Sequence, residues 1–448
     1  MKKLFALLLA QVMVLGMASC GEKAGGGTSS TGNAASNVAA GEGPTVTIWE
    51  CNWGGDAYEG ALKKQAQRAT DENIDGKGIK VETSMVAWDN YYDTFLTAVV
   101  SKTAPDIACE ASTGCIQYAD MGEALDLMPI YDAWVAEGSP IVDEVGQAAF
   151  DFETFNGELI GLPFSKDGTG LFYNKELFEG AGITELPTTW DEFMEVCDKL
   201  LAKYPEVVPF AFAGSDFASL TNVNDLFMMS NGASILTKDL EPNLQSDKYT
   251  EIMGIIKEMY DKGYIGRAVI SYTGDDIKRM MNTGETAVIL TNAPTWVAED
   301  MQDKIGVMNP VKGPSVEEPY IASAFQAYHA FNQTENPEET LAVLKWWYEN
   351  NDILYTEGGN GCIPIRASQQ EKVMTSELVR EYANVWLNAE NSYPNIYPVQ
   401  SFYPFHTTMD AEGTGAKPLN ALLAGDDYQA TIDQVCDEIS EIIEDAGY

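Results

Sequence analysis

A regular alternation of strand-like and helical segments begins at Thr45 and constrains the fold more than any other feature of the chain. The runs "TVTIW", "IKVETSMV" and "PDIACEA" are short and largely apolar, as buried strands are. Amphipathic helical spacing separates them, at residues 58–73 and 91–101. Strands that alternate with helices predict an α/β fold with largely parallel sheets.

The clearest predicted helix is "TTWDEFMEVCDKLLAKY", in which Thr189 and Glu192 form a capping box. "VVPFAFAG" and "TAVILTN" are further predicted strands, and "NPEETLAVLKWWYEN" and the C-terminal segment are further predicted helices. Most tryptophans on these helices are expected to pack in the core. They are Trp134, Trp190 and Trp386, together with at least one of Trp346 and Trp347.

The length of the chain predicts two globular lobes. At 448 residues it exceeds what one hydrophobic core usually supports. Hydrophobic residues make up 45% of the sequence, which is enough to fill two cores and is not typical of a disordered chain.

The N-terminal segment is predicted to be a cleaved export signal. "MKKLFALLLAQVMVLGMAS", residues 1–19, has two lysines, an apolar run and then small residues. The four residues from Met17 to Cys20 resemble a bacterial lipobox, although that pattern prefers Leu where Met17 stands. Residues 20–43 are rich in Gly, Ser and Ala and predict a flexible tether. We therefore expect Cys20 to be lipidated and to anchor an outward-facing body to the membrane.

The acidic composition argues against nucleic-acid binding. The chain has 68 Asp and Glu against 27 Lys and Arg, a formal net charge of −41 at pH 7. Such a surface repels phosphate backbones and anionic lipid heads. Solubility outside the cell explains this acidity more simply than a specific basic partner does.

Cysteine and histidine usage gives no zinc signature, because no C-x-x-C pair is present and only two histidines occur. Cys197 and Cys436 fall on apolar helix faces and are expected to be small core residues. The sequence leaves open whether the other cysteines of the body form disulfides. They are Cys51, Cys109, Cys115 and Cys362.

Several segments, taken in order, resemble the carbohydrate-type extracellular solute-binding proteins of bacterial ABC transporters. They include "TVTIWE", "NGELIGLPFSKDGTGLFYNKELFEGAGITELPTTWDEF", "MNTGETAVILTNAPTW", "FNQTENPEETLAVLKWW" and "GGNGCIPIRAS". The resemblance spans nearly the whole chain after the tether. It implies a two-lobed, type II periplasmic-binding-protein-like fold that the chain crosses three times and that closes on a sugar in the cleft between the lobes.

The resemblance also places the crossings and the lobes. The crossings match segments rich in Gly or Pro, as hinges that absorb φ/ψ changes can be; they lie near residues 161–173, 308–313 and 358–365. Lobe 1 is expected to comprise residues 44–162 and 312–360. Lobe 2 is expected to comprise residues 163–311 and 361–448.

Candidate ligand residues follow the predicted strands, because ligands of open α/β sheets sit beyond the carboxyl ends of the strands. This rule selects Asn52, Trp53, Ser112, Asp167, Asn292 and Trp296. Trp53 and Trp296 could stack on a sugar face, with core packing as the alternative for each.

Four further candidates come with the resemblance. Asp106 begins a predicted strand, where a structural cap is an equal alternative. Tyr173 borders the first crossing within a motif more typical of a hinge. Gly359 and Asn360 belong to "GGNG", which could offer backbone N–H groups or simply bend the chain.

One motif indicates a different chemistry. "DENIDGKGIKVE", residues 71–82, matches the spacing of a calcium-binding loop. Gly78 stands where such loops carry an apolar anchor, and the segment leads into a predicted strand instead of a helix. A plain helix-to-strand turn is therefore the preferred interpretation.

The leading hypothesis is a lipid-anchored receptor that captures a sugar or oligosaccharide and delivers it to an ABC transporter permease. We expect no catalysis, no cofactor and no metal, and a monomer. The first alternative is a secreted carbohydrate-active enzyme, which needs a carboxylate pair across a cleft. The second keeps the fold but binds a peptide, a polyamine or an iron complex. "NSYPNIYPVQSFYPF", residues 391–405, is interpreted as a loop that lines the cleft.

Overall fold

A computed structural model describes residues 38–110, 113–292, 294, 297–389, 391–399 and 402–448. Several sequence predictions therefore fall outside the described residues. They are the export signal, the lipidated Cys20, most of the tether, Ser112 and Trp296, together with the side chain of Asp167.

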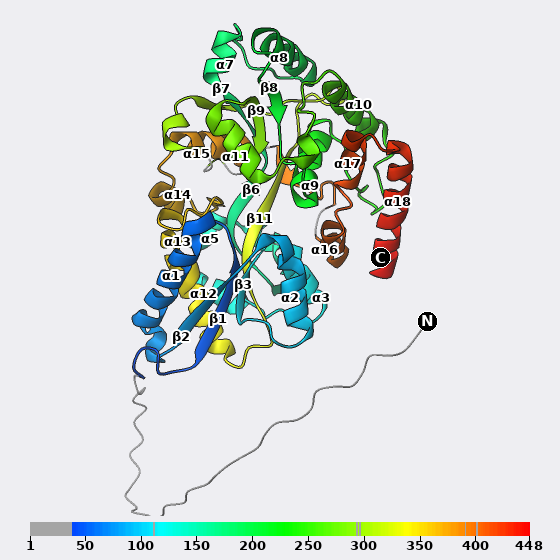
Figure 1. The fold of residues 1–448 in the computed structure, drawn as a ribbon. Coiled ribbons are helices and arrows are strands. Elements are labelled where there is room, and N and C mark those ends of the chain that lie inside the picture. Colours follow the sequence, from blue (N-terminus) through cyan, green and yellow to red (C-terminus); the bar gives the residue numbers. More distant parts are fainter. Residues whose placement is uncertain (1–37, 111–112, 293, 295–296, 390, 400–401) are drawn as a thin grey trace, which may run out of the picture. The chain divides into compact units, whose positions relative to one another are not determined.

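A seven-stranded sheet forms the larger of two strand layers, with the order β12-β6-β11-β3-β1-β2 and β13 beside β11 (Figure 1). We call the half of the molecule built on it the large-sheet lobe. Its strands are β1 (Thr45–Cys51), β2 (Lys80–Val86), β3 (Ile107–Cys109), β6 (Leu162–Gly168), β11 (Ile321–Ala330), β12 (Ile363–Pro364) and β13 (Ser392–Pro394).

A four-stranded sheet forms the second layer, with the order β10-β7-β9-β8. We call the half built on it the small-sheet lobe. Its strands are β7 (Gly170–Asn174), β8 (Val208–Ala211), β9 (Thr286–Thr291) and β10 (Ile305–Met308). A short hairpin, β4 (Thr154–Phe155) with β5 (Glu158–Leu159), stands apart from both sheets.

Both sheets are mixed, so the prediction of largely parallel sheets is wrong. β1 pairs in parallel with β2 and β3, and β8 pairs in parallel with β9. β6 and β11 run antiparallel to each other, and β7 runs antiparallel to both β9 and β10. The antiparallel strands are those next to the passages of the chain from one sheet to the other, where no βαβ crossover sets a parallel direction.

The first passage joins β6 directly to β7 through Thr169. The second lies between β10 and β11, and the third follows β12. All three fall in or beside the segments that the sequence marked as crossings.

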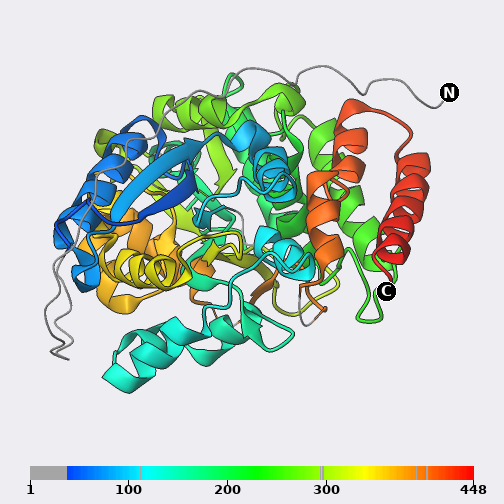
Figure 2. The ribbon, with the colours of Figure 1, turned by 90° about the horizontal axis from the view of Figure 1, so that it is seen from below.

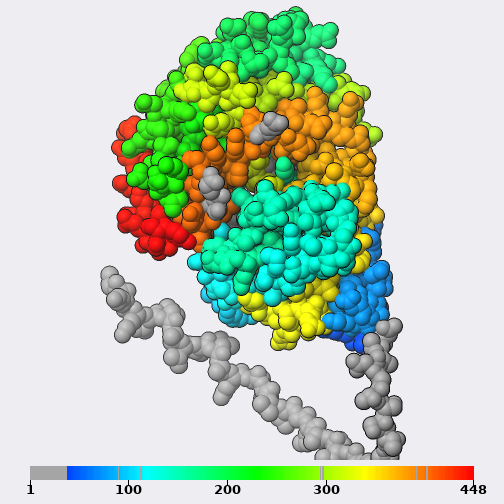
Figure 3. All heavy atoms as spheres, turned by 180° about the vertical axis from the view of Figure 1, so that it is seen from behind, coloured from blue at the N-terminus to red at the C-terminus, as the bar shows by residue number. Residues whose placement is uncertain are grey.

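Helices cover both faces of the seven-stranded sheet. α1 (Tyr58–Glu72), α12 (Pro337–Asn350) and α13 (Asp352–Thr356) lie on one face, and α2 (Tyr91–Val100) and α3 (Thr113–Asp120) on the other (Figure 1). A separate layer contains α4 (Met128–Glu137), α5 (Ile141–Val145) and α6 (Gln147–Phe152), coloured cyan to teal in Figures 2 and 3.

The remaining helices belong mainly to the small-sheet lobe and include the predicted helix with the Thr189–Glu192 capping box, which is confirmed. They are α7 (Lys175–Gly180), α8 (Trp190–Lys203), α9 (Phe217–Ser230), α10 (Asp247–Asp261), α11 (Gly274–Thr283), α14 (Ala367–Val373), α15 (Glu377–Tyr382) with a following π-helical turn (Ala383–Leu387), α16 (Pro404–Ala411), α17 (Lys417–Ala424) and α18 (Tyr428–Asp445).

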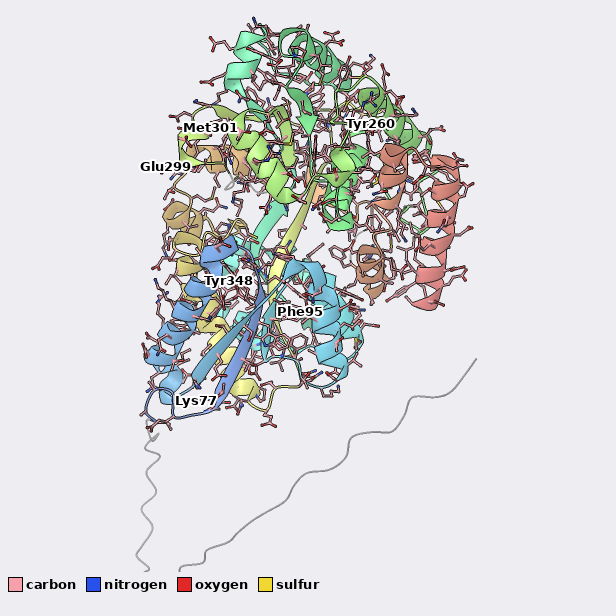
Figure 4. The ribbon with its side chains drawn as sticks, viewed as in Figure 1. Lys77, Phe95, Tyr260, Glu299, Met301 and Tyr348 are labelled. Carbon is pink, nitrogen blue, oxygen red and sulfur yellow. The ribbon has the colours of Figure 1, made fainter. Side chains whose placement is uncertain are left out.

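Successive side chains of a strand point to opposite faces of the sheet, so the core of the large-sheet lobe consists of two apolar clusters, one on each face. In β3, Ile107 and Cys109 contact the apolar cluster under α1 and α12, whereas Ala108 contacts the cluster under α2. Figure 4 labels one member of each cluster, Tyr348 and Phe95, on opposite sides of β1.

The small-sheet lobe has its own core, which includes Trp190 and Phe193. The predictions that Trp134, Trp190, Trp347 and Trp386 are core residues are confirmed, since each is at most 2% exposed. Cys197 is fully buried on α8, also as predicted. All six cysteines that the structure describes are free thiols. Within the described residues, the helices are too short or too polar to cross a lipid bilayer.

Candidate functional site

The carboxyl ends of β1 and β2 lie side by side. The parallel register pairs Thr45 with Lys80 at the start and Cys51 with Val86 at the end, so the segments that follow Cys51 and Val86 emerge at one edge of the sheet. Figure 4 labels Lys77 at the opposite end, where both strands begin. The carboxyl edge is the one nearer the small-sheet lobe (Figure 1).

Three aromatic side chains gather at this edge, and we call Trp53, Trp88 and Tyr91 the aromatic surface. The rings of Trp53 and Trp88 meet edge to face with centroids 4.7 Å apart, and those of Trp88 and Tyr91 do so at 5.1 Å. Trp88 is 37% exposed, so part of its ring is accessible to a ligand. Trp53 is half-buried and also contacts Phe164.

Asn52 links β1 to this surface through its backbone. The indole N–H of Trp88 donates to the Asn52 carbonyl oxygen at 2.9 Å, which orients the exposed ring. The side-chain Oδ1 of Asn52 accepts a longer hydrogen bond from the backbone N–H of Gly54, at 3.4 Å.

The "GGNG" segment packs directly on the end of β1. The backbone N–H of Gly361 donates to the Trp53 carbonyl oxygen at 3.0 Å. A Cβ at Gly54 would lie 2.0 Å from the carbonyl oxygen of Gly358, so the two backbones approach as closely as glycine permits. Gly359 has a positive φ of 67° and turns the chain at this point.

Asn360 is the candidate in this segment with unused hydrogen-bonding capacity. Its side chain is 5% exposed, and its Oδ1 accepts from the backbone N–H of Cys362 at 2.9 Å. Its buried Nδ2 has no hydrogen-bond partner among the described residues. A buried amide donor without a partner is costly, and a ligand oxygen could satisfy it.

The first crossing follows β6, which pairs with β12 just after the "GGNG" segment, so the crossing and this segment lie side by side. Lys166 of β6 pairs with Ile363 of β12, and Asp167 pairs with Ala324 of β11. Across the crossing, Gly170 pairs with Thr291, the last residue of β9, so Asn292 follows at the same place. The structure therefore places Asn52, Trp53, Gly359 and Asn360 together, with the backbone of Asp167 on the neighbouring strand, and Asn292 follows β9 on the other side of the crossing.

Two predicted candidates lie elsewhere. Asp106 is at the amino-terminal edge of the sheet, where its Oδ2 accepts from the N–H and the hydroxyl of Thr47 at 2.7 and 2.8 Å. Asp106 therefore has the structural role that was its alternative, and it lies outside the candidate site. Tyr173 is four residues beyond Thr169, and its ring contacts Phe178 at 4.7 Å and packs close to Gly306. This contact is internal to the small-sheet lobe.

Buried acids lie directly behind the carboxyl edge. Glu50 accepts hydrogen bonds from the Tyr58 hydroxyl at 2.5 Å and the Trp347 indole at 3.0 Å, and burial raises its pKa to about 7. Glu110 follows β3, is 1% exposed, and lies 3.5 Å from Nε2 of His329. Burial raises the pKa of Glu110 to about 8 and lowers the pKa of His329 to about 3, so both are neutral at pH 7.

Trp88 and Tyr91 are site residues that the sequence prediction missed. Both follow the predicted strand "IKVETSMV", and the rule of carboxyl strand ends selects them as readily as it selects Trp53.

The segment with calcium-loop spacing is a turn between α1 and β2, as the sequence favoured. Asn73 and Asp75 have positive φ angles of 54° and 53°. The Asn73 side chain is used internally: its Oδ1 accepts from the Gly78 N–H at 2.8 Å. Among the described residues, no group of three or more His, Cys, Asp or Glu is placed to hold a metal ion.

The arrangement of two sheet-based lobes, joined by three passages and meeting at the carboxyl ends of parallel strands, defines an α/β solute-binding architecture. Residues 59–351 match the family model described as bacterial extracellular solute-binding protein. The chain belongs to that family.

Individual relatives agree with this assignment. A putative binding protein of Brucella abortus (strain 2308) is 25% identical over 300 residues, covering 65% of this chain and 70% of the relative. The arabinooligosaccharide-binding protein of Halalkalibacterium halodurans is 25% identical over 317 residues, covering 66% of each chain.

Solved structures confirm the predicted two-lobed, periplasmic-binding-protein-like fold. A sugar transporter protein from Arthrobacter chlorophenolicus A6 with bound laminaribiose superposes with a TM-score of 0.78 at 20% identity, covering 89% of this chain and 99% of that one. Maltose-bound T. maritima MalE3 gives 0.73 at 18% identity, covering 89% and 100%.

Proposed function

We propose that this protein is the extracytoplasmic receptor of a carbohydrate ABC transporter. Its two lobes, residues 44–162 with 312–360 and residues 163–311 with 361–448, close on a sugar or oligosaccharide, and the closed form delivers it to the membrane permease. Lipidated Cys20 and the tether of residues 20–43 hold the receptor at the membrane. The receptor acts as a monomer and leaves its ligand chemically unchanged.

The exposed indole of Trp88 is the single observation that carries the sugar assignment. The C–H faces of a pyranose are apolar and flat, so they pack on aromatic rings, and a buried platform of this kind contributes on the order of a few kcal/mol. Trp88 is held by its hydrogen bond to Asn52 and by its neighbours Trp53 and Tyr91. A large aromatic ring that is ordered yet exposed at a ligand edge is suited to stacking.

The polar groups beside the aromatic surface fit the hydroxyl rim of a sugar. Asn360 offers a buried Nδ2 donor, and Asn52 and Asn292 add amide groups from the ends of β1 and β9. Amides both donate and accept, as a ring of hydroxyls requires. The relatives whose names specify arabinooligosaccharide, lactose and diacetylchitobiose support the same ligand class.

A melting-temperature screen against mono- and oligosaccharides tests the proposal. A ligand at ~100 times its Kd stabilises the folded protein by about 2.7 kcal/mol. We expect at least one sugar to raise Tm, and the sugar to be recovered intact afterwards. A shift with peptides, polyamines or iron complexes and with no sugar contradicts the sugar assignment, and accumulation of cleaved sugar supports the enzyme alternative instead.

A further inference from the structure

A second set of polar groups lines a cavity in the small-sheet lobe. The cavity lies between α9, α16 and residues 395, 396 and 402, and has a volume of about 30 Å³. That volume is too small for a sugar ring, but it can take a group of the size of one or two water molecules, such as an ammonium group. Its polar lining includes Asp225, Asp410, Asn395 and His406, with Phe402 as an apolar wall.

Two carboxylates share this cavity without a cationic partner. Asp225 is 6% exposed, and its one hydrogen bond from a described residue comes from Nδ2 of Asn395, at a long 3.3 Å. Asp410 is on the exposed side of α16. Among the residues that the structure describes, neither carboxylate forms an ion pair with a lysine or arginine. A buried carboxylate beside a second one is unfavourable, so burial and the charge of Asp410 raise the pKa of Asp225 to about 8, and a cation that reached it would favour the ionised form.

Two further groups in the cavity have unused hydrogen-bonding capacity. Nδ1 of His406 lies 2.9 Å from the backbone N–H of Tyr403 and 3.2 Å from the Tyr403 carbonyl oxygen, and the shorter contact favours the neutral ring with its proton on Nε2. His406 is 3% exposed, and its Nε2 has no partner among the described residues. The buried Oδ1 of Asn395 likewise has none. The cavity therefore presents acceptors at Asp225, Asp410 and Asn395, and one donor at His406.

The cavity adjoins the aromatic surface. α16 packs against α3 of the large-sheet lobe (Figure 1). Burial raises the pKa of Tyr91, and the charges of Glu110 and then Asp410 raise it further, so Asp410 acts electrostatically on both Tyr91 and Asp225. A ligand on the aromatic surface could therefore extend into the cavity past Asp410.

We propose that this cavity is a subsite for the protonated amino group of an aminated sugar. The ammonium binds between Asp225 and Asp410 with Asn395 Oδ1 as a further acceptor, and a neighbouring hydroxyl accepts from the Nε2–H of His406. This inference rests on the proposed function and adds that the preferred ligand carries a positive charge. A neutral sugar can use the same hydroxyl contacts, but Asp225 then stays protonated at pH 7, because burial and the charge of Asp410 raise its pKa to about 8.

The test compares matched sugars by titration calorimetry on the complete protein body. Glucose, galactose and mannose are each used in the hydroxyl, 2-amino and N-acetylated 2-amino forms, together with the β-1,4-linked disaccharides of glucose, glucosamine and N-acetylglucosamine. These forms differ at one substituent, so the charge is separated from ring shape. The amino form of at least one sugar should bind at least tenfold tighter than both of its neutral counterparts.

Single substitutions test whether the preference for amino sugars arises in this cavity. Asp225→Asn should reduce the preference for the amino form to within about twofold, so that the amino and neutral forms of one sugar bind alike. Asp426→Asn removes one exposed negative charge outside the cavity and should preserve the preference. If Asp225→Asn does not fold, Asp410→Asn provides the same test from the exposed side of the cavity.

The outcomes separate this inference from the proposed function. Neutral sugars that bind as tightly as the amino forms overturn the charged subsite and leave sugar capture standing. An amino preference that persists in both the Asp225→Asn and Asp410→Asn variants also overturns it. If no sugar of any form binds, both proposals fail.

Discussion

The indole rings of Trp53 and Trp88 meet edge to face, with centroids 4.7 Å apart and planes inclined by 83°. Trp53 follows β1 and Trp88 follows β2, so the parallel register of these two strands creates the contact. Trp53 supports Trp88 from the half-buried side, and Trp88 presents its ring to solvent. Together the two indole rings form an aromatic surface at the edge of the sheet, on which a sugar ring can stack.

Removing the exposed ring should therefore affect binding more than stability. Trp88→Ala should weaken sugar binding at least tenfold, because the ligand loses its stacking face, while Tm in the absence of sugar changes little. Fluorescence or calorimetric titration gives the affinity, and a thermal melt gives the stability. Trp346 is half-buried on α12, beside Arg68, and is the matched control. Equal losses in Trp88→Ala and Trp346→Ala would remove Trp88 from the site.

Asp106 should show the opposite behaviour. Its carboxylate joins the start of β3 to Thr47 of β1 through two short hydrogen bonds at the edge remote from the ligand. Asp106→Ala should lower the free energy of unfolding by about 1–3 kcal/mol, since the N–H and the hydroxyl of Thr47 lose the oxygen that accepts from both. Sugar affinity of the folded variant should match that of the wild type, and a change in affinity with unchanged urea stability would contradict this assignment.

The glycines of the first crossing are required by close packing in this structure, a reason that differs from the rotational freedom suggested by the sequence. A Cβ at Gly170 would lie 2.9 Å from Cε2 of Tyr382 and 3.2 Å from Cδ1 of Trp386. Gly170→Ala should therefore destabilise the protein by about 1–3 kcal/mol in urea unfolding.

Gly60 is the control for that substitution, because it lies in α1 with open space where its Cβ would be. Gly60→Ala should stabilise the protein by about 0.5–1 kcal/mol. A Gly170→Ala variant as stable as the wild type would show that the crossing tolerates a side chain and that the packing account is wrong.

Stability should fall as the pH rises from 6.5 to 8. Burial raises the pKa values of Glu110, Glu153 and Asp225 to about 8, with the charge of Asp410 as a second cause at Asp225. In this range the folded state holds protons that the unfolded state has released, so each group lowers stability by about 1 kcal/mol per pH unit. Groups that face Asp225 include Asp410 and His406 of α16 and Tyr249 of α10.

The lower limit of this pH window is set by the two buried histidines. Burial lowers the pKa of His329 to about 3 and that of His406 to about 4, so each opposes the acids below pH 6.5 and is neutral above it. Glu153→Gln should reduce the slope of Tm against pH between 6.5 and 8. A Tm that stays constant or rises across this interval contradicts the burial of these acids.

Local patterns predicted much of the fold. The strands at Thr45, Lys80 and Thr286 and the helix at Trp190 were correctly expected, because each carries its periodicity and its caps within a short stretch. Strand direction was not predictable in the same way, since the antiparallel pairing of β6 with β11 joins residues about 160 positions apart.

The site was only partly predictable, for the same physical reason. Asn52, Trp53 and Asn292 follow strands and could be selected from the sequence alone. Asp225, Asn395 and His406 come from a helix interior, a loop and a second helix, and no local spacing links them. Asp106 fits its structural alternative, because a residue that precedes a parallel strand lies at the edge opposite to the carboxyl ends of the strands.

The most direct test of the account is equilibrium dialysis of the protein against the sugar that raises Tm most, followed by mass spectrometry of the retained ligand. The account predicts that one sugar molecule is retained per chain, chemically intact, and that Trp88→Ala retains at least tenfold less at a subsaturating concentration. Retention of no sugar, or recovery of cleaved sugar, would contradict a receptor that captures a carbohydrate and delivers it unchanged.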